Sequence, residues 1–175
     1  QIFSNLIPFL TLPASACVNG EFSKLSLEKD EEGKAVFSSS NEKMTFEFFC
    51  DSIVVTYSKT FDEDTPIYIS KLFKDKEGAI ELKDFDRAFT PQPRNNAWKN
   101  MDYFNHLPDI SLNGYFIPAT FNFSIGNPDG WVSFGLLDIP DTSICKMDND
   151  YSFLVESCGG NKIIKKGETY TMPQV

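Results

Sequence analysis

The chain has 175 residues, the length of one ordinary domain, which buries about two-thirds of the surface that its unfolded form exposes. Hydrophobic residues make up 41% and charged residues 23%, a balance that argues against a disordered or fibrous chain. The formal net charge is −9, and Lys and Arg are not clustered, which argues against nucleic acid and anionic membranes as partners.

Residues 1–16 are predicted to form an extended N-terminal arm of a single domain that spans residues 1–175. The longest apolar run, residues 6–12, contains Pro8 and is too short to cross a bilayer, so we expect no membrane insertion. The run is similar to the apolar part of a signal peptide, but no Lys or Arg precedes Lys24. We therefore expect Gln1 to begin an already processed chain. The alternatives are a retained leader and a lipoprotein-like segment that ends at Cys17.

The first half of the chain shows the alternation of apolar and polar residues that is typical of β-strands. Residues 22–27 and 35–38 flank an acidic turn at residues 30–34, where Gly33 gives the backbone freedom. In the next strand the side chains of Met44, Phe46, Phe48 and Cys50 share one face. Residues 53–57 follow a tight reversal at residues 51–52, which predicts a hairpin or a bulge.

Strand signals continue to the C-terminal end. Residues 67–73 and 79–82 flank a charged turn at residues 74–78. The clearest hairpin joins residues 120–125 to residues 131–137 through residues 127–130, Asn-Pro-Asp-Gly, because Pro fixes φ and Gly tolerates a positive φ. Residues 151–155 and 163–164 complete the set, and only residues 84–89 suggest a short helical turn.

These strands predict an all-β fold, and the chain contains 17 Phe, a residue type that favours strands. We expect an antiparallel β-sandwich that is immunoglobulin-like, fibronectin-III-like or jelly-roll-like. A β-barrel or a β-trefoil is the alternative, because the number of strands does not separate closure from stacking.

Four cysteines, Cys17, Cys50, Cys145 and Cys158, are widely spaced and form no C-x-x-C pair. We expect two disulfide bonds, Cys17–Cys50 and Cys145–Cys158, with Cys17–Cys158 and Cys50–Cys145 as the alternative. Disulfides indicate an oxidising compartment, so the chain is predicted to be secreted or on the cell surface. The sequon Asn122-Phe123-Ser124 makes Asn122 a candidate glycosylation site.

The residues offer little for catalysis, and we expect no enzyme activity and no metal or other cofactor. A His-based catalytic triad would depend on His106, the one histidine in the chain. Glu47 and Asp138 are the carboxylates considered for glycoside hydrolysis, and each is better explained as a surface residue. The acidic clusters at residues 62–64 and 148–150 lack the glycine and distal glutamate of an EF-hand loop.

Residues 95–106 are the segment most suggestive of recognition. This segment is predicted to be a loop, and it places aromatic side chains among amides. Trp98, Tyr103, Phe104 and His106 are the candidate binding residues. Aromatic rings beside hydrogen-bond donors suit a sugar or the pocket of a protein partner. The plainer interpretation is a long loop that its aromatic rings anchor to the core.

We therefore expect a secreted or cell-surface binding or adhesion module that recognises a glycan or a protein through aromatic and carboxylate side chains. The second hypothesis is a secreted inhibitor or a host-directed effector, for which a rigid scaffold is equally suitable. The third hypothesis is a carboxylate-dependent enzyme that acts on glycans.

Homotypic association at acidic pH also follows from the charge. Repulsion between copies weakens as the pH falls from 7 toward the sequence pI of about 4.6. Sedimentation velocity at pH 7 and pH 5 measures this, and the sedimentation coefficient should be higher at pH 5. An unchanged coefficient would contradict the prediction.

Overall fold

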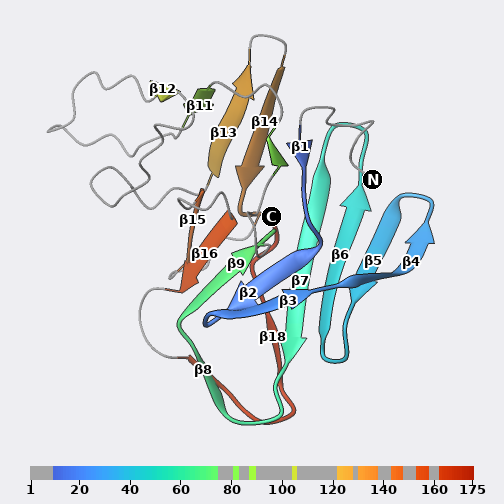
Figure 1. Ribbon diagram of the computed structural model, residues 1–175, viewed down its shortest axis with the longest axis vertical. Helices are drawn as coiled ribbons and strands as arrows, with labels where there is room; N and C mark the ends of the chain where they lie inside the picture. Colours follow the sequence, from blue (N-terminus) through green and yellow to red (C-terminus); the bar gives the residue numbers. More distant parts are fainter. Residues whose placement is uncertain are drawn as a thin grey trace, which may run out of the picture.

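The structure is a computed structural model that describes residues 10–74, 81–82, 87–89, 104–105, 122–127, 130–137, 143–147, 153–157 and 162–175. Every regular element in these ranges is a β-strand, and the strands pair in antiparallel sheets (Figure 1). Within these ranges no helix is long and apolar enough to cross a membrane. The all-β prediction is confirmed for this part of the chain.

The first five-stranded sheet has the order β18-β7-β6-β5-β4. Its strands are β4 (Ser26–Glu31), β5 (Lys34–Ser38), β6 (Glu42–Phe48), β7 (Ile53–Thr60) and β18 (Thr169–Thr171). Met44 and Phe46 on β6 lie opposite Tyr57 and Val55 on β7, and all four side chains are buried. Alternate residues of a strand point to the same face, so this period-two pattern gives the sheet one apolar face. Gly33 takes a φ of 78° in the predicted turn between β4 and β5.

The second five-stranded sheet has the order β15-β16-β9-β2-β3. Its strands are β2 (Ser15–Val18), β3 (Glu21–Lys24), β9 (Ile69–Leu72), β15 (Ser143–Met147) and β16 (Phe153–Ser157). Asn19 and Gly20 join β2 to β3 with φ values of 52° and 89°, the two positive values of a type I′ turn. Ala16 on β2 pairs with Leu72 on β9, and both are fully buried. The end of the predicted N-terminal arm therefore contributes an inner strand of this sheet.

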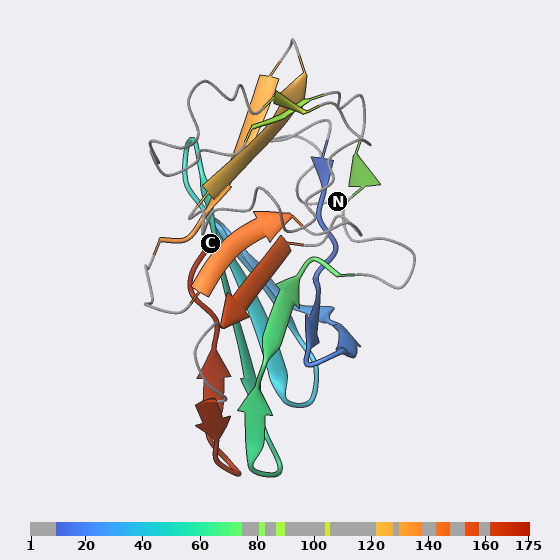
Figure 2. The ribbon, with the colours of Figure 1, turned by 90° about the vertical axis from the view of Figure 1, so that its left-hand side faces the viewer.

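The remaining strands form one four-stranded sheet and two short pairs. The sheet has the order β12-β11-β13-β14 and consists of β11 (Arg87–Phe89), β12 (Phe104–Asn105), β13 (Asn122–Asn127) and β14 (Gly130–Gly135). The pairs are β1 (Leu10–Thr11) with β10 (Glu81–Leu82) and β8 (Thr65–Ile67) with β17 (Lys162–Ile164). Figures 1 and 2 show β13 and β14 at one end of the molecule and β8 at the other.

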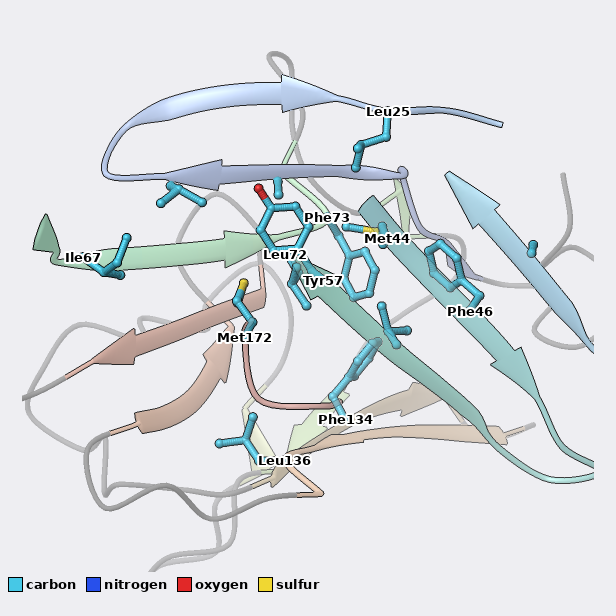
Figure 3. Close-up of a cluster of buried hydrophobic side chains, with 14 of the residues drawn as sticks. Leu25, Met44, Phe46, Tyr57, Ile67, Leu72, Phe73, Phe134, Leu136 and Met172 are labelled. Carbon is cyan, nitrogen blue, oxygen red and sulfur yellow. The ribbon is translucent and has the colours of Figure 1, made fainter. Parts of the chain in front are cut away.

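Buried apolar side chains of both five-stranded sheets form one core (Figure 3). The ring of Phe46 on β6 stacks on the ring of Phe73, which follows β9, with centroids 6.4 Å apart. Phe37 on β5 meets Phe46 edge-on at 5.5 Å. Phe134 and Leu136 extend the same core toward the four-stranded sheet. The Phe46–Phe73 contact thus joins the two five-stranded sheets directly.

Two predicted turns are confirmed by the strand pairing. Asn127 pairs with Gly130, so β13 and β14 form the predicted hairpin. The reversal at residues 51–52 joins β6 to β7, and the Phe49 amide donates to the Ser52 carbonyl at 2.8 Å. Turn chemistry acts over a few residues, which is why it was readable without the tertiary structure.

One other local prediction is wrong. Residues 84–89 suggested a helical turn, but Arg87–Phe89 form β11, whose partners are β12 and β13. Residues 75–78 of the predicted charged turn lie outside the described residues. The strands on either side of it pair elsewhere, since β9 pairs with β2 and β16 while β10 pairs with β1. A short strand takes its hydrogen bonds from partners far away in the sequence, and local patterns do not show these partners.

The predicted Cys17–Cys50 disulfide is also wrong, and so is the alternative pairing of these thiols, because both are free. Cys17 is half-buried on β2, and Cys50 is exposed in the turn after β6. Glu42, at the start of β6, bonds to Ser23 in the hairpin that contains Cys17. Cys50 follows Glu42 along β6 and the turn after it. At about 3.3 Å per residue, these two residues are roughly 25 Å apart, whereas a disulfide requires Cα atoms within about 7 Å. Cys145 lies on β15, but its side chain and Cys158 are outside the described residues, so the Cys145–Cys158 bond stays a prediction.

Replacing Phe46 with Ala should lower the free energy of unfolding by about 3–5 kcal/mol, because the cavity would lie where the two sheets meet. Urea denaturation followed by tryptophan fluorescence measures the loss. Phe49→Ala is the matched control, since Phe49 is 55% exposed and its removal should change stability by less than about 1 kcal/mol. Equal losses in the two variants would contradict this description of the core.

Candidate functional site

The binding residues predicted from the sequence lie almost entirely outside the described residues. Trp98, Tyr103 and His106 belong to that part. Phe104 begins β12 and pairs with Phe89 on β11, so this end of the segment is a short strand and not the loop that was predicted. Asn122, the candidate glycosylation site, begins β13 and pairs with Gly135. The binding role of the segment and the glycosylation of Asn122 stay predictions.

The acidic residues weighed for catalysis or calcium have surface roles where the structure describes them. Glu47 forms an ion pair with Lys34 at 2.9 Å on the outer face of the sheet, and both side chains are about two-fifths exposed. Asp64 accepts hydrogen bonds from Lys165 Nζ at 2.7 Å and from the Lys166 amide at 2.9 Å, and these bonds lower its pKa. No group of three His, Cys, Asp or Glu side chains within the described residues could hold a metal ion. Asp138 and residues 148–150 lie outside those residues.

An exposed apolar surface lies where β8 pairs with β17. Ile163 on β17 is opposite Pro66 on β8, and the buried Ile67 and Ile164 lie next to them in the chain. Because strand side chains alternate, Pro66 and Ile163 share the outward face. Tyr68 follows β8 and is 54% exposed, and Ile163 is 52% exposed. We call Pro66, Tyr68 and Ile163 the Tyr68 surface.

Asn19 fixes the backbone beneath the Tyr68 surface. Its Nδ2 donates to the Pro66 carbonyl at 2.6 Å, and its Oδ1 accepts from the amides of Tyr68 at 2.8 Å and Ile69 at 3.3 Å. Its own amide donates to the Ile69 carbonyl at 2.9 Å. Two successive amides that bond to one acceptor mark a local break in the strand, and this break separates β8 from β9 and leaves Tyr68 exposed. One asparagine therefore makes four hydrogen bonds to the bend that carries Tyr68.

A group of polar residues is buried between the two five-stranded sheets. Glu42 on β6 lies opposite Lys59 on β7 in the sheet register, and Lys59 lies opposite Tyr170 on β18. The Glu42 Oε1 to Lys59 Nζ distance is 2.9 Å, and the two side chains are 2% and 7% exposed. We call Glu42, Lys59, Ser23 and Tyr57 the Glu42 cluster. Ser23 on β3 donates to Glu42 Oε1 at 2.7 Å, so the cluster reaches across to the other sheet.

Tyr57 in the Glu42 cluster and Tyr170 next to the cluster are held in their neutral form. Burial raises the pKa of Tyr57 far above its ordinary value, and the negative charge of Glu42 raises it further. Burial also raises the pKa of Tyr170, whose hydroxyl accepts a hydrogen bond from Ser70 at 3.3 Å. A hydrogen bond between the Tyr57 and Glu42 side chains raises the pKa of Tyr57 as well. The buried carboxylate and the buried hydroxyl are thus neighbours within the cluster.

The chain matches no protein-family model, no curated protein and no solved structure. Functional inference therefore depends on the arrangement of its own residues.

Sequence reasoning missed both of these features. The Asn19-Gly20 dipeptide between two short apolar stretches is a strong hairpin signal, and it could have located the turn that carries Asn19. Nothing local could have shown that Tyr68 is exposed, because it lies in an apolar run that predicts a buried strand. The Glu42–Lys59 pair joins separate strands, and only their register brings the two charges together.

Asn19→Gly should lower the free energy of unfolding by about 1–3 kcal/mol, because glycine keeps the positive φ but loses three side-chain hydrogen bonds. Amide exchange at Tyr68 and Ile69 should become faster as well. Asn41→Ala is the comparison, since Asn41 donates one side-chain bond, to the Thr60 carbonyl at 3.1 Å, and its loss should cost less. Unchanged exchange at Tyr68 and Ile69 in Asn19→Gly would contradict the role given to Asn19.

Proposed function

We propose that this chain is a secreted or cell-surface binding module, without catalytic activity, that recognises a protein partner through the Tyr68 surface. The observation that carries the proposal is an exposed tyrosine on a bend fixed by Asn19, two residues after Pro66, whose cross-strand partner Ile163 is also exposed. The scaffold in this proposal is a β-sandwich made of the two five-stranded sheets.

Exposure and chemistry favour Tyr68 as an anchor for binding. A tyrosine offers a large flat area and a hydroxyl while ordering only two side-chain torsions, and tyrosines are enriched among the residues that dominate interface energies. The neighbouring Ile163 and Pro66 offer aliphatic surface and no hydrogen-bonding side chains. An aliphatic border suits the apolar side chains of a protein better than the hydroxyl groups of a sugar.

Rigidity strengthens the proposal. Binding requires that the contacting groups be ordered, and this ordering costs conformational entropy. A surface that is already ordered in the folded protein loses less entropy when it binds. The four hydrogen bonds in which Asn19 takes part hold Pro66, Tyr68 and Ile69 in the free protein. The paired strands β8 and β17 hold Ile163 in the same way.

Secretion is part of the proposal and is supported by the sequon at Asn122. Since Cys17 and Cys50 are free, they add no support for an oxidising compartment. Glycan recognition through Trp98, Tyr103, Phe104 and His106 is the alternative, and the experiment below separates the two.

The test uses purified chain on an array of purified cell-surface ectodomains and on a glycan array. We expect binding to an ectodomain that weakens about tenfold to a hundredfold in Tyr68→Ser and in Ile163→Ser, the range for loss of a dominant interface residue. Phe49→Ser is the control, because Phe49 is equally exposed but lies at the turn between β6 and β7.

Ectodomain binding that Tyr68→Ser leaves unchanged would contradict the proposed surface. Binding confined to the glycan array and lost in Trp98→Ala would replace the proposal with glycan recognition. Absence of binding on both arrays would contradict the proposed class of function.

A further inference from the structure

The Glu42 cluster joins the first five-stranded sheet to β3, the edge strand of the second sheet. Glu42 Oε1 accepts from Lys59 Nζ at 2.9 Å in its own sheet and from Ser23 Oγ on β3 at 2.7 Å. Lys59 Nζ also reaches Glu21 Oε2 on β3 at 3.4 Å. Both contacts between this ion pair and the second sheet therefore go to the same edge strand, which pairs only with β2 within the described sheet.

The groups around Glu42 and its neighbours Lys59 and Tyr57 come from four strands. Lys59 and Tyr57 lie on β7, and Ser23 and Glu21 lie on β3. Tyr170 on β18 and Cys17 on β2 lie near Tyr57. Lys59 also lies over the ring of Phe61, with Nζ 5.5 Å from the ring centroid. Glu21 is 78% exposed, so water screens its charge strongly. Glu42 is therefore the buried carboxylate that compensates the buried charge of Lys59.

Protonation of Glu42 would remove that compensation. The ammonium of Lys59 would then be buried beside a neutral acid, and a buried charge that has lost its partner strongly destabilises the fold. The Tyr57 hydroxyl lies close to the Glu42 carboxylate and can accept a hydrogen bond from the protonated acid. That hydrogen bond does not replace the lost negative charge beside Lys59.

We propose that Glu42 is an acid-sensitive latch that holds the edge strand β3 against the first sheet and releases it when the carboxylate is protonated. Release lets Lys59 reach water, which relieves its buried charge. The strand can open while the centre of the core stays packed, because its residues are exposed or half-buried. The buried apolar residues that the structure describes in this sheet lie on β2 and β9.

Hydrogen exchange read by mass spectrometry on peptides that cover residues 20–25 tests the latch. The intrinsic amide exchange rate at each pH is divided by the measured exchange rate. The resulting protection factors can be compared between pH 7 and pH 4. In the natural chain we expect protection of this segment to fall on the order of tenfold or more on acidification, whereas β6 stays protected. Glu42→Gln, a neutral isostere, should show the low protection already at pH 7 and little further change at pH 4.

Two variants serve as controls. Glu47→Gln removes a Glu–Lys pair on the outer face of the same sheet and should leave the protection of residues 20–25 as in the natural chain. Glu42→Gln combined with Lys59→Met removes both charges, so the segment should keep its protection at both pH values. This double variant also keeps the test decisive if Glu42→Gln alone fails to fold.

Protection of residues 20–25 that does not change between pH 7 and pH 4 in the natural chain would overturn the latch. A fall in protection that persists in the double variant would also overturn it, because the acid response would then come from other groups.

Discussion

The apolar contact between the two five-stranded sheets is the interaction on which the rest of this structure depends. Phe46 from one sheet stacks on Phe73 from the other, and Met44, Tyr57 and Leu72 fill the space around them (Figure 3). Burial of such side chains contributes about 1.5–3 kcal/mol each, which is large beside the marginal stability of a domain. Each sheet has an apolar face only because its strands alternate, so this contact also fixes which residues reach the surface.

Polar groups inside this contact make it specific and sensitive. Glu42 and Lys59 lie opposite each other on neighbouring strands, and their hydrogen bonds reach Ser23 and Glu21 on the facing sheet. A buried ion pair adds little net stability compared with apolar residues, but loss of one partner is costly. The same low-dielectric core that holds the sheets together therefore makes the attachment of β3 depend on one carboxylate.

The proposed binding surface is a consequence of the same framework. Ile67 and Ile164 are buried at 2% and 4% exposure, so the side chains next to them in the strands, Pro66 and Ile163, point outward. Asn19 holds the bend that carries the exposed Tyr68. The hairpin β2–β3 thus has two roles: its turn carries Asn19, and its edge strand carries the contacts to the Glu42 cluster. A scaffold of this kind presents a rigid surface, which is what a binding module requires.

The sequence by itself determined the all-β class, the period-two face of β6 and the turns at Gly33 and residues 127–130, because these depend on neighbours within a few residues. Only the tertiary structure decided which strands are neighbours, since β9 pairs with β2 and β16 and not with β10. It also decided that Cys17 and Cys50 are free and that Tyr68 is exposed. The physical reason is that alternation records which way a side chain points, whereas the partner it meets depends on strands far away in the chain.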